Sequence, residues 1–137
     1  MASDTRAGSL VGAGLDEIVR ALRRSRKTVE IATPFMSHPV AALLVRETAQ
    51  VRQRRLLVAL NDAAVQGGYL DPRGIEEFVD SDFEVRSLRN LHAKVVVADR
   101  RWALVGSGNL TVAGSNGGNA ELGVVLAPGQ ARRAAVD

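Results

Sequence analysis

The chain has 137 residues, a formal net charge of +3 at pH 7 and no cysteine. This length suits a single domain that buries roughly two thirds of its unfolded surface, and the lack of cysteine excludes disulfides and thiolate metal sites. The first residues, MASDTRAGSL, show neither a basic nor an apolar segment. We therefore expect no signal peptide and no transmembrane span, and a cytoplasmic protein without stable membrane association.

Helices alternate with strands in the first half of the predicted fold. The spacing of apolar residues, the acidic first turn of the first helix and the position of prolines define the elements. Residues 1–13 are expected to be flexible. The predicted elements are a helix over 15–26, a strand over 28–33, a helix over 39–52, a strand over 55–60 closed by Asn61-Asp62, and a helix over 72–79.

Strands dominate the second half. They are predicted over 83–88, over the segment around Val95–Val97, over 102–106 after a turn at Asp99-Arg100-Arg101, and over 121–126. Residues 128–137 are typical of the opening of a helix, either frayed or cut short. Together the elements predict one α/β domain over 1–137, a mixed β-sheet with helices on its faces.

The most informative stretch is residues 91–111, which place several polar side chains in one predicted hairpin. In a strand that contains Val95–Val97, His92 and Lys94 point to the same face. Ser107 and Asn109 follow the returning strand. Imidazole, ammonium, hydroxyl and amide groups side by side favour a site for an oxyanion, with phosphate as the leading choice.

The register of this hairpin determines whether the polar groups meet. If residues 100–101 form a two-residue turn, Lys94 lies opposite Ser107, and His92 lies opposite Asn109. A slip of one residue would turn Ser107 and Asn109 away from His92 and Lys94, because side chains alternate between faces.

The motif reads His92-x-Lys94-x4-Asp99 and then Gly106-Ser107-x-Asn109. It resembles the HKD signature of the phospholipase D superfamily. Glu121, which follows a glycine-rich loop over 114–118, resembles the acidic residue that this family places after the second segment. The resemblance covers residues 91–123 strongly and residues 15–90 only as alternating strands and helices. It implies a phospholipase D-like half-barrel unit.

Elementary chemistry indicates how His92 would act. A neutral imidazole attacks phosphorus through one nitrogen only if the other nitrogen carries a proton that an acceptor holds. Glu121 is the best candidate for that acceptor. Asp99 would lie seven strand residues away, roughly 23 Å, and on the opposite face. We therefore interpret Asp99 as a residue of the hairpin end and not as a partner of His92.

Lys94, Ser107 and Asn109 would donate to the nonbridging oxygens and offset the charge that builds up in the transition state. Of the 18 basic residues only Lys27 and Lys94 are lysine. A chain that otherwise uses arginine retains lysine within an apolar strand, where a compact ammonium fits a tight oxyanion pocket better than a guanidinium. Taken singly, His92 is also typical of an ordinary core histidine, and the glycine-rich segment 106–109 is also typical of a turn.

The resemblance implies the rest of the mechanism. One histidine becomes a covalent phosphohistidine, and a second, protonated histidine gives its proton to the leaving oxygen. The chain has one copy of the signature, so the resemblance implies a homodimer in which the two His92 side chains meet at the two-fold axis. The scheme needs no metal and no cofactor, and the sequence offers no other ligand set.

Basic clusters at residues 23–27 and 52–55 favour a polyanionic partner, with DNA preferred over RNA. Arg54 and Arg55 are candidate substrate contacts, and so is His38, which follows the end of a predicted strand. The competing interpretation treats the arginine-rich faces as ordinary solvated surface, and His38 as part of a surface or helix-capping segment.

The leading hypothesis is a metal-independent, homodimeric nuclease that cleaves DNA. The alternatives are a catalytically weak nucleic-acid-binding module of a larger defence or repair assembly, and a phospholipid phosphodiesterase. A lipid enzyme would be expected to show two signature copies in one longer chain or a hydrophobic entry surface, neither of which is visible in the sequence.

Overall fold

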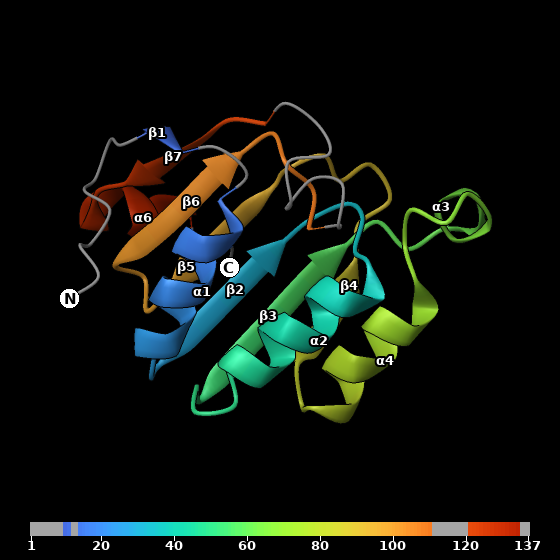
Figure 1. Cartoon of the computed structure of the whole chain (residues 1–137), viewed down its shortest axis with the longest axis horizontal. Coiled ribbons are helices and arrows are strands. Elements are labelled where there is room, and N and C mark those ends of the chain that lie inside the picture. Colours follow the sequence, from blue (N-terminus) through green and yellow to red (C-terminus); the bar gives the residue numbers. More distant parts are fainter. Residues whose placement is uncertain (1–9, 12–13, 111–120, 135–137) are drawn as a thin grey trace.

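The computed structural model describes residues 10–11, 14–110 and 121–134 (Figure 1). In this part of the chain a seven-stranded sheet has the order β1-β7-β6-β5-β2-β3-β4. β2, β3 and β4 are parallel, and the other neighbours are antiparallel. The strands are β1 (Leu10–Val11), β2 (Thr28–Ala32), β3 (Gln53–Val58), β4 (Glu84–Ser87), β5 (Val95–Ala98), β6 (Trp102–Gly106) and β7 (Gly123–Leu126).

The helices lie on both faces of this sheet, with α1, α2 and α4 on one face and α6 on the other (Figure 1). This arrangement confirms the predicted α/β class with a mixed sheet. Of residues 1–13, which were expected to be flexible, the structure describes Leu10–Val11 as strand β1 paired with β7, and the others lie outside the described residues. The helices are α1 (Leu15–Arg24), α2 (His38–Glu47), α3 (Asp62–Gln66), α4 (Pro72–Asp80) and α6 (Pro128–Ala134).

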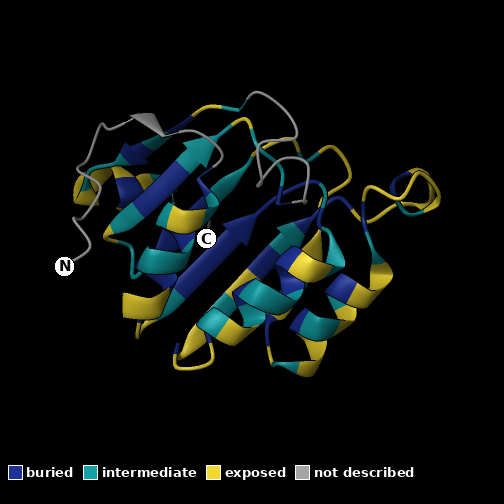
Figure 2. Cartoon of the chain, viewed as in Figure 1, coloured by how far each residue is buried: buried dark blue, intermediate teal, exposed yellow. Residues whose placement is uncertain are grey.

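The main core lies between the sheet and the three helices on one face. β2 is buried along most of its length (Figure 2), with Val29 and Ile31 packed in one cluster with Leu22 of α1 and Leu44 of α2. A smaller cluster on the other face joins Val97 and Ala103 to α6. Each fully buried Leu, Ile or Val contributes roughly 1.5–3 kcal/mol, so burial of β2 stabilises the fold.

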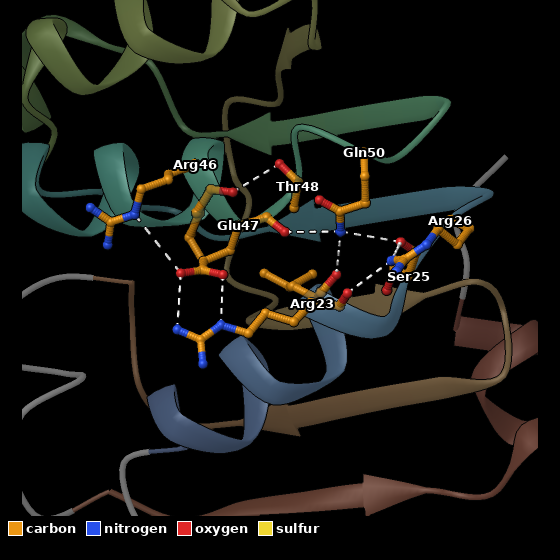
Figure 3. A network of polar contacts seen from close by, with 9 residues as sticks. Arg23, Ser25, Arg26, Arg46, Glu47, Thr48 and Gln50 are labelled. Carbon is orange, nitrogen blue, oxygen red and sulfur yellow. Dashed lines mark hydrogen bonds and ion pairs between the residues drawn. The ribbon is translucent and has the colours of Figure 1, made fainter.

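The predicted second helix is wrong at its C-terminal end, because α2 ends at Glu47 and not near Arg52. The Thr48 hydroxyl donates to the carbonyl of Leu44 at 2.8 Å and closes the last turn. Beyond it, the Gln50 amide donates to the Leu22 carbonyl of α1 at 2.9 Å (Figure 3). This side-chain contact turns the chain toward the neighbouring helix and ends α2.

The short helix α3 was not predicted. Asn61 was expected to close a strand, but its side chain accepts the N–H of Ala64 at 2.9 Å and caps the new helix.

The register of the β5–β6 hairpin differs from the prediction by one residue. Ala98, and not Asp99, pairs with Trp102. The turn therefore has three residues, 99–101, and Asp99 and Arg100 adopt left-handed backbone angles, with φ of 53° and 55°. Asp tolerates this conformation better than most residues because its short side chain can bond locally.

Two parts of the sequence interpretation are therefore wrong. The N–H of Gly106 donates to the Lys94 carbonyl at 3.1 Å, so Lys94 lies opposite Gly106 and not opposite Ser107. In addition β5 begins at Val95, so His92 precedes the strand and does not form a cross-strand pair with Asn109. The four polar side chains do not share one face of a regular hairpin.

Asp99 ties the hairpin turn to the loop between α1 and β2. Its carboxylate accepts the backbone N–H groups of Arg26, Lys27 and Thr28 at 2.7–3.2 Å, and its own N–H donates to the Thr28 carbonyl at 2.7 Å. Burial by itself raises the pKa of the Asp99 carboxyl, but these three donors outweigh it and hold the pKa below its usual value. Asp99 thus lies at the hairpin end, where it was expected.

We predict that Asp99→Asn lowers the free energy of unfolding by about 1–2 kcal/mol at pH 7, because the amide replaces a charge-assisted acceptor of three N–H groups. Asn tolerates the same left-handed backbone, so Asp99→Asn removes the negative charge without straining the turn. Since folding lowers this pKa, the stabilisation is complete above the unfolded value of about 4 and is lost as the pH falls through the folded value.

Urea unfolding of both proteins at neutral and acidic pH measures this effect. The difference between them should narrow below about pH 4. A constant difference across that range would show that the charge of Asp99 is not the stabilising feature.

Candidate active site

The motif residues gather at the end of the sheet where β2 ends and β5 begins. After β6 the chain passes the start of β5 and reaches the loop that follows β2, where the N–H of Leu110 donates to the Thr33 hydroxyl at 3.3 Å. The N–H of Ser37 in turn donates to the Leu110 carbonyl at 3.1 Å. These bonds hold the segment 107–110 over the start of β5.

Thr33 is completely buried, and the sequence interpretation did not include it. A buried hydroxyl at a strand end is a weak signal, because threonine is common in strands. Its role in the site follows only from its contact with Leu110, which is far away in the sequence.

His92 and Lys94 form the first half of the site. The Lys94 ammonium donates to the His92 carbonyl at 2.9 Å and lies 3.3 Å from the ring nitrogen Nδ1. His92 is exposed and Lys94 is half-buried. Because an ammonium can only donate, Nδ1 faces it as an acceptor, and the neutral ring then carries its proton on Nε2.

Ser107 and Glu121 form the second half. The Ser107 hydroxyl donates to the Glu121 carboxylate at 2.5 Å and accepts the N–H of Leu122 at 3.0 Å. Glu121 was expected to hold the proton of His92, but here its carboxylate accepts from Ser107. The contact joins the segment after β6 to the segment before β7.

Gly106 allows the two segments to approach. It pairs with Gly123 of β7, and a Cβ atom on Gly106 would lie 3.0 Å from the Leu122 carbonyl oxygen and 3.2 Å from the Gly123 Cα. The glycine of the motif is therefore required for space, since both neighbours are backbone atoms that cannot rotate away.

His38 lies at the same end of the sheet, but its side chain contacts helix α4. It begins α2, one residue after Ser37, and its Nε2 lies 3.1 Å from the Glu77 carboxylate of α4. Nearby, Asp71 caps α4, and hydrogen bonding from Arg73 lowers the pKa of the Asp71 carboxyl although burial opposes this. The structure thus places His38 beside the site and pairs it with α4.

Arg54 and Arg55 lie at the opposite end of the sheet. Arg54 pairs in register with Val29, at the end where Ala98 enters the hairpin turn. The Arg54 guanidinium donates to the Ser81 carbonyl and lies 5.1 Å above the Phe83 ring centroid. The Arg55 side chain lies 3.5 Å from the Glu84 carboxylate. The structure does not bring either residue to His92.

The basic cluster of residues 23–27 also lies at this far end, and part of it is engaged internally (Figure 3). Arg23 binds both carboxylate oxygens of Glu47 at 2.8 and 3.2 Å, and this hydrogen bonding lowers the pKa of Glu47. Arg26 donates to the carbonyls of Arg23 and Ser25 at 2.8 Å. The basic clusters therefore do not surround His92.

Within the described residues, no group of three or more His, Cys, Asp and Glu side chains is placed to hold a metal ion. Among the helices that the structure describes, none has both the length and the apolar character needed to cross a bilayer.

Comparison with known families identifies the family of this domain. The family model described as "Cardiolipin synthase, PLD-like domain" matches residues 18–133. The chain belongs to the phospholipase D superfamily. The match extends through the elements before the motif as well as the motif itself. No curated protein sequence matches the chain.

Solved structures share the fold of this phospholipase D-like domain. Nuc from Salmonella typhimurium, a phospholipase D family member, has a TM-score of 0.70 at 18% identity, over 91% of this chain and 88% of its own. NucT from Helicobacter pylori has a TM-score of 0.63 at 16% identity, over 93% and 89%. TrmBL2, an archaeal chromatin protein, has a TM-score of 0.64 at 11% identity, over 98% of this chain and 51% of its own.

We predict that Gly106→Ala destabilises the phospholipase D-like domain by about 1–3 kcal/mol, because the new methyl group presses on the backbone of β7. Gly129→Ala is the matched control, since a Cβ on Gly129 of α6 meets nothing within 4 Å, and alanine favours a helix. Urea unfolding of the two variants measures the difference. Equal stabilities would show that β6 and β7 are not closely packed at Gly106.

We also predict that the neutral His92 ring carries its proton on Nε2 in the free protein. The ¹⁵N chemical shifts of the two ring nitrogens distinguish the tautomers. Lys94→Met removes the ammonium that faces Nδ1, so the preference should weaken in that variant. A protonated Nδ1 in the wild type would contradict the contact with Lys94.

Proposed function

We propose that this domain is a metal-independent phosphodiesterase that cleaves DNA through a phosphohistidine on His92. The observation that carries the proposal is the pairing of His92 with Lys94 at the exposed edge where Ser107 and Glu121 also meet. An imidazole nucleophile beside an ammonium donor is the minimum that attack on a phosphodiester requires.

In the proposed reaction, Lys94 moves from the His92 carbonyl to a nonbridging oxygen of the bound phosphate. Nδ1 is then released and takes up the ring proton, with Glu121 as its acceptor, so that Nε2 presents its lone pair. Nε2 attacks phosphorus and the P–O bond to the leaving group breaks. Water later attacks the same phosphorus, the P–N bond breaks, and His92 is restored.

The leaving oxygen needs a proton, and we propose that a second copy of the chain supplies it. The chain has two histidines, and His38 is paired with Glu77 on another helix. The exposed His92 of one protomer can meet its counterpart across a two-fold axis. One ring then acts as nucleophile and the other, protonated, as acid; once it has given its proton to the leaving oxygen, this second ring accepts the proton of the attacking water.

DNA is the proposed substrate. The basic clusters lie at the end of the sheet opposite to His92, so they support contact with a polyanion only away from the reacting phosphate. TrmBL2, which shares the fold, is described as showing a mode of DNA binding. Small members of the superfamily with one motif copy also resemble sequence-nonspecific endonucleases.

A second candidate is a weakly catalytic nucleic-acid-binding module of a larger defence or repair assembly. The observation that favours it is the contact of Glu121 with Ser107, which leaves His92 without this carboxylate in the free protein.

We predict that the wild type cleaves DNA in excess EDTA and forms a base-stable covalent adduct with it. His92→Ala should abolish the adduct and lower the cleavage rate by roughly 10³-fold or more, because the nucleophile is lost. Arg132→Ala, on α6, is the control and should leave the rate unchanged. Light scattering of the same samples should show a dimer.

Each other outcome identifies an alternative. Binding of DNA without cleavage or adduct would support the binding module, and hydrolysis of phospholipid vesicles alone would support a lipid enzyme. Cleavage that survives His92→Ala would refute the proposed nucleophile.

A further inference from the structure

A short row of backbone pairs extends the sheet beyond β2, next to the site. Met36 forms parallel bridges to Leu70 on one side and Leu110 on the other. All three side chains are buried, with exposed fractions of 0%, 0% and 5%. The inward side of this row is therefore part of the core.

The residues one step earlier in each segment are Phe35, Tyr69 and Asn109. Tyr69 is exposed, whereas Phe35 is half-buried and packs against the core, and Asn109 is half-buried. Neighbouring segments lie about 4.8 Å apart, which places Phe35 between Tyr69 and Asn109. The ring centroids of Phe35 and Tyr69 are 5.2 Å apart with an interplanar angle of 32°. An aromatic pair thus borders the motif segment.

Backbone contacts on both sides hold this pair in place. The Thr33 hydroxyl donates to the Phe35 carbonyl at 2.9 Å, and the N–H of Asp71 donates to the Met36 carbonyl at 3.0 Å. The Tyr69 ring also covers Gly67, where a Cβ atom would come within 2.6 Å of the ring. The pair is ordered before any substrate binds, so a ligand would not have to immobilise it.

Exposure makes the pair available. Tyr69 is 59% exposed, in a chain that has only 4% aromatic residues. Phe35 is half-buried and supports it from the side of the core. An aromatic face that is open to solvent and separated from the motif residue Asn109 only by Phe35 suits stacking with a flat ligand group.

We propose that Tyr69, supported by Phe35, stacks with an unpaired nucleobase next to the reacting phosphate and directs the enzyme to single-stranded nucleic acid. The inference rests on the proposed function and specifies its substrate. A base within a duplex is already stacked on both faces and cannot reach the ring, whereas a single strand presents its bases freely. Stacking accepts any base, so the selection concerns strandedness and not sequence.

The test compares three probes in excess EDTA: a single-stranded oligonucleotide, the same strand in a duplex, and a single strand of abasic nucleotides with the same phosphate backbone. We expect the wild type to cleave the first fastest. Tyr69→Ala should slow that reaction by roughly 5- to 100-fold, the effect of losing one stacked base, and should leave cleavage of the abasic strand unchanged.

Two further variants separate stacking from folding. Tyr69→Trp retains an aromatic face and should retain the single-strand preference. Val79→Ala removes another exposed apolar side chain, on α4, and should have no effect on any probe.

The outcomes distinguish this inference from the function on which it rests. If Tyr69→Ala cleaves the single strand at the wild-type rate, or slows all three probes equally, the stacking role is wrong although the nuclease stands. If no probe is cleaved, the nuclease is wrong, and fluorescence anisotropy decides the stacking role: wild type must bind the normal strand more tightly than the abasic one, and Tyr69→Ala must not. Tyr69-dependent hydrolysis of phosphatidylglycerol vesicles alone would overturn the inference in favour of a lipid.

Discussion

The bond network around the Asp99 carboxylate sets the geometry on which the rest of the structure depends. Three backbone N–H groups of the loop before β2 donate to this side chain. These bonds fix a turn whose first two residues adopt left-handed backbone angles. A three-residue turn fixed in this way places Ala98 opposite Trp102. The motif aspartate therefore acts through the register of the hairpin, at the end of the sheet opposite to the chemistry.

The register in turn divides the site into two halves. Lys94 lies opposite Gly106, so the next residue, Ser107, is free to turn toward β7 and bind Glu121. His92 and Lys94 contact each other on the other side. The bond from the Gly106 N–H to the Lys94 carbonyl joins the two halves, and bonds of Leu110 with Thr33 and Ser37 tie the segment 107–110 to the loop after β2. In this arrangement binding of a phosphate would have to draw Lys94 away from His92.

The two ends of the sheet have different electrostatic character. The end of the sheet that carries His92 combines the motif residues with the exposed Tyr69. The arginines of residues 23–27 and 52–55 lie at the other end, with the hairpin turn. Several of these arginines form ion pairs or bind carbonyl oxygens. The arginine clusters and the motif residues therefore lie on separate surfaces at opposite ends of the sheet.

The sequence alone determined the class of fold, most helices and strands, the motif and the family. These follow from local information: apolar spacing, turn residues and fixed intervals between polar groups. The end of α2, the capped helix α3 and the hairpin register were decided by the tertiary structure, because Gln50, Asn61 and Asp99 each have an alternative that only a contact selects. The placement of Phe35 between Tyr69 and Asn109 could not be predicted either, since it depends on the pairing of Met36 with two segments distant in the chain. Local patterns encode which groups are present, but their mutual positions depend on long-range pairing, whose register changes by whole residues.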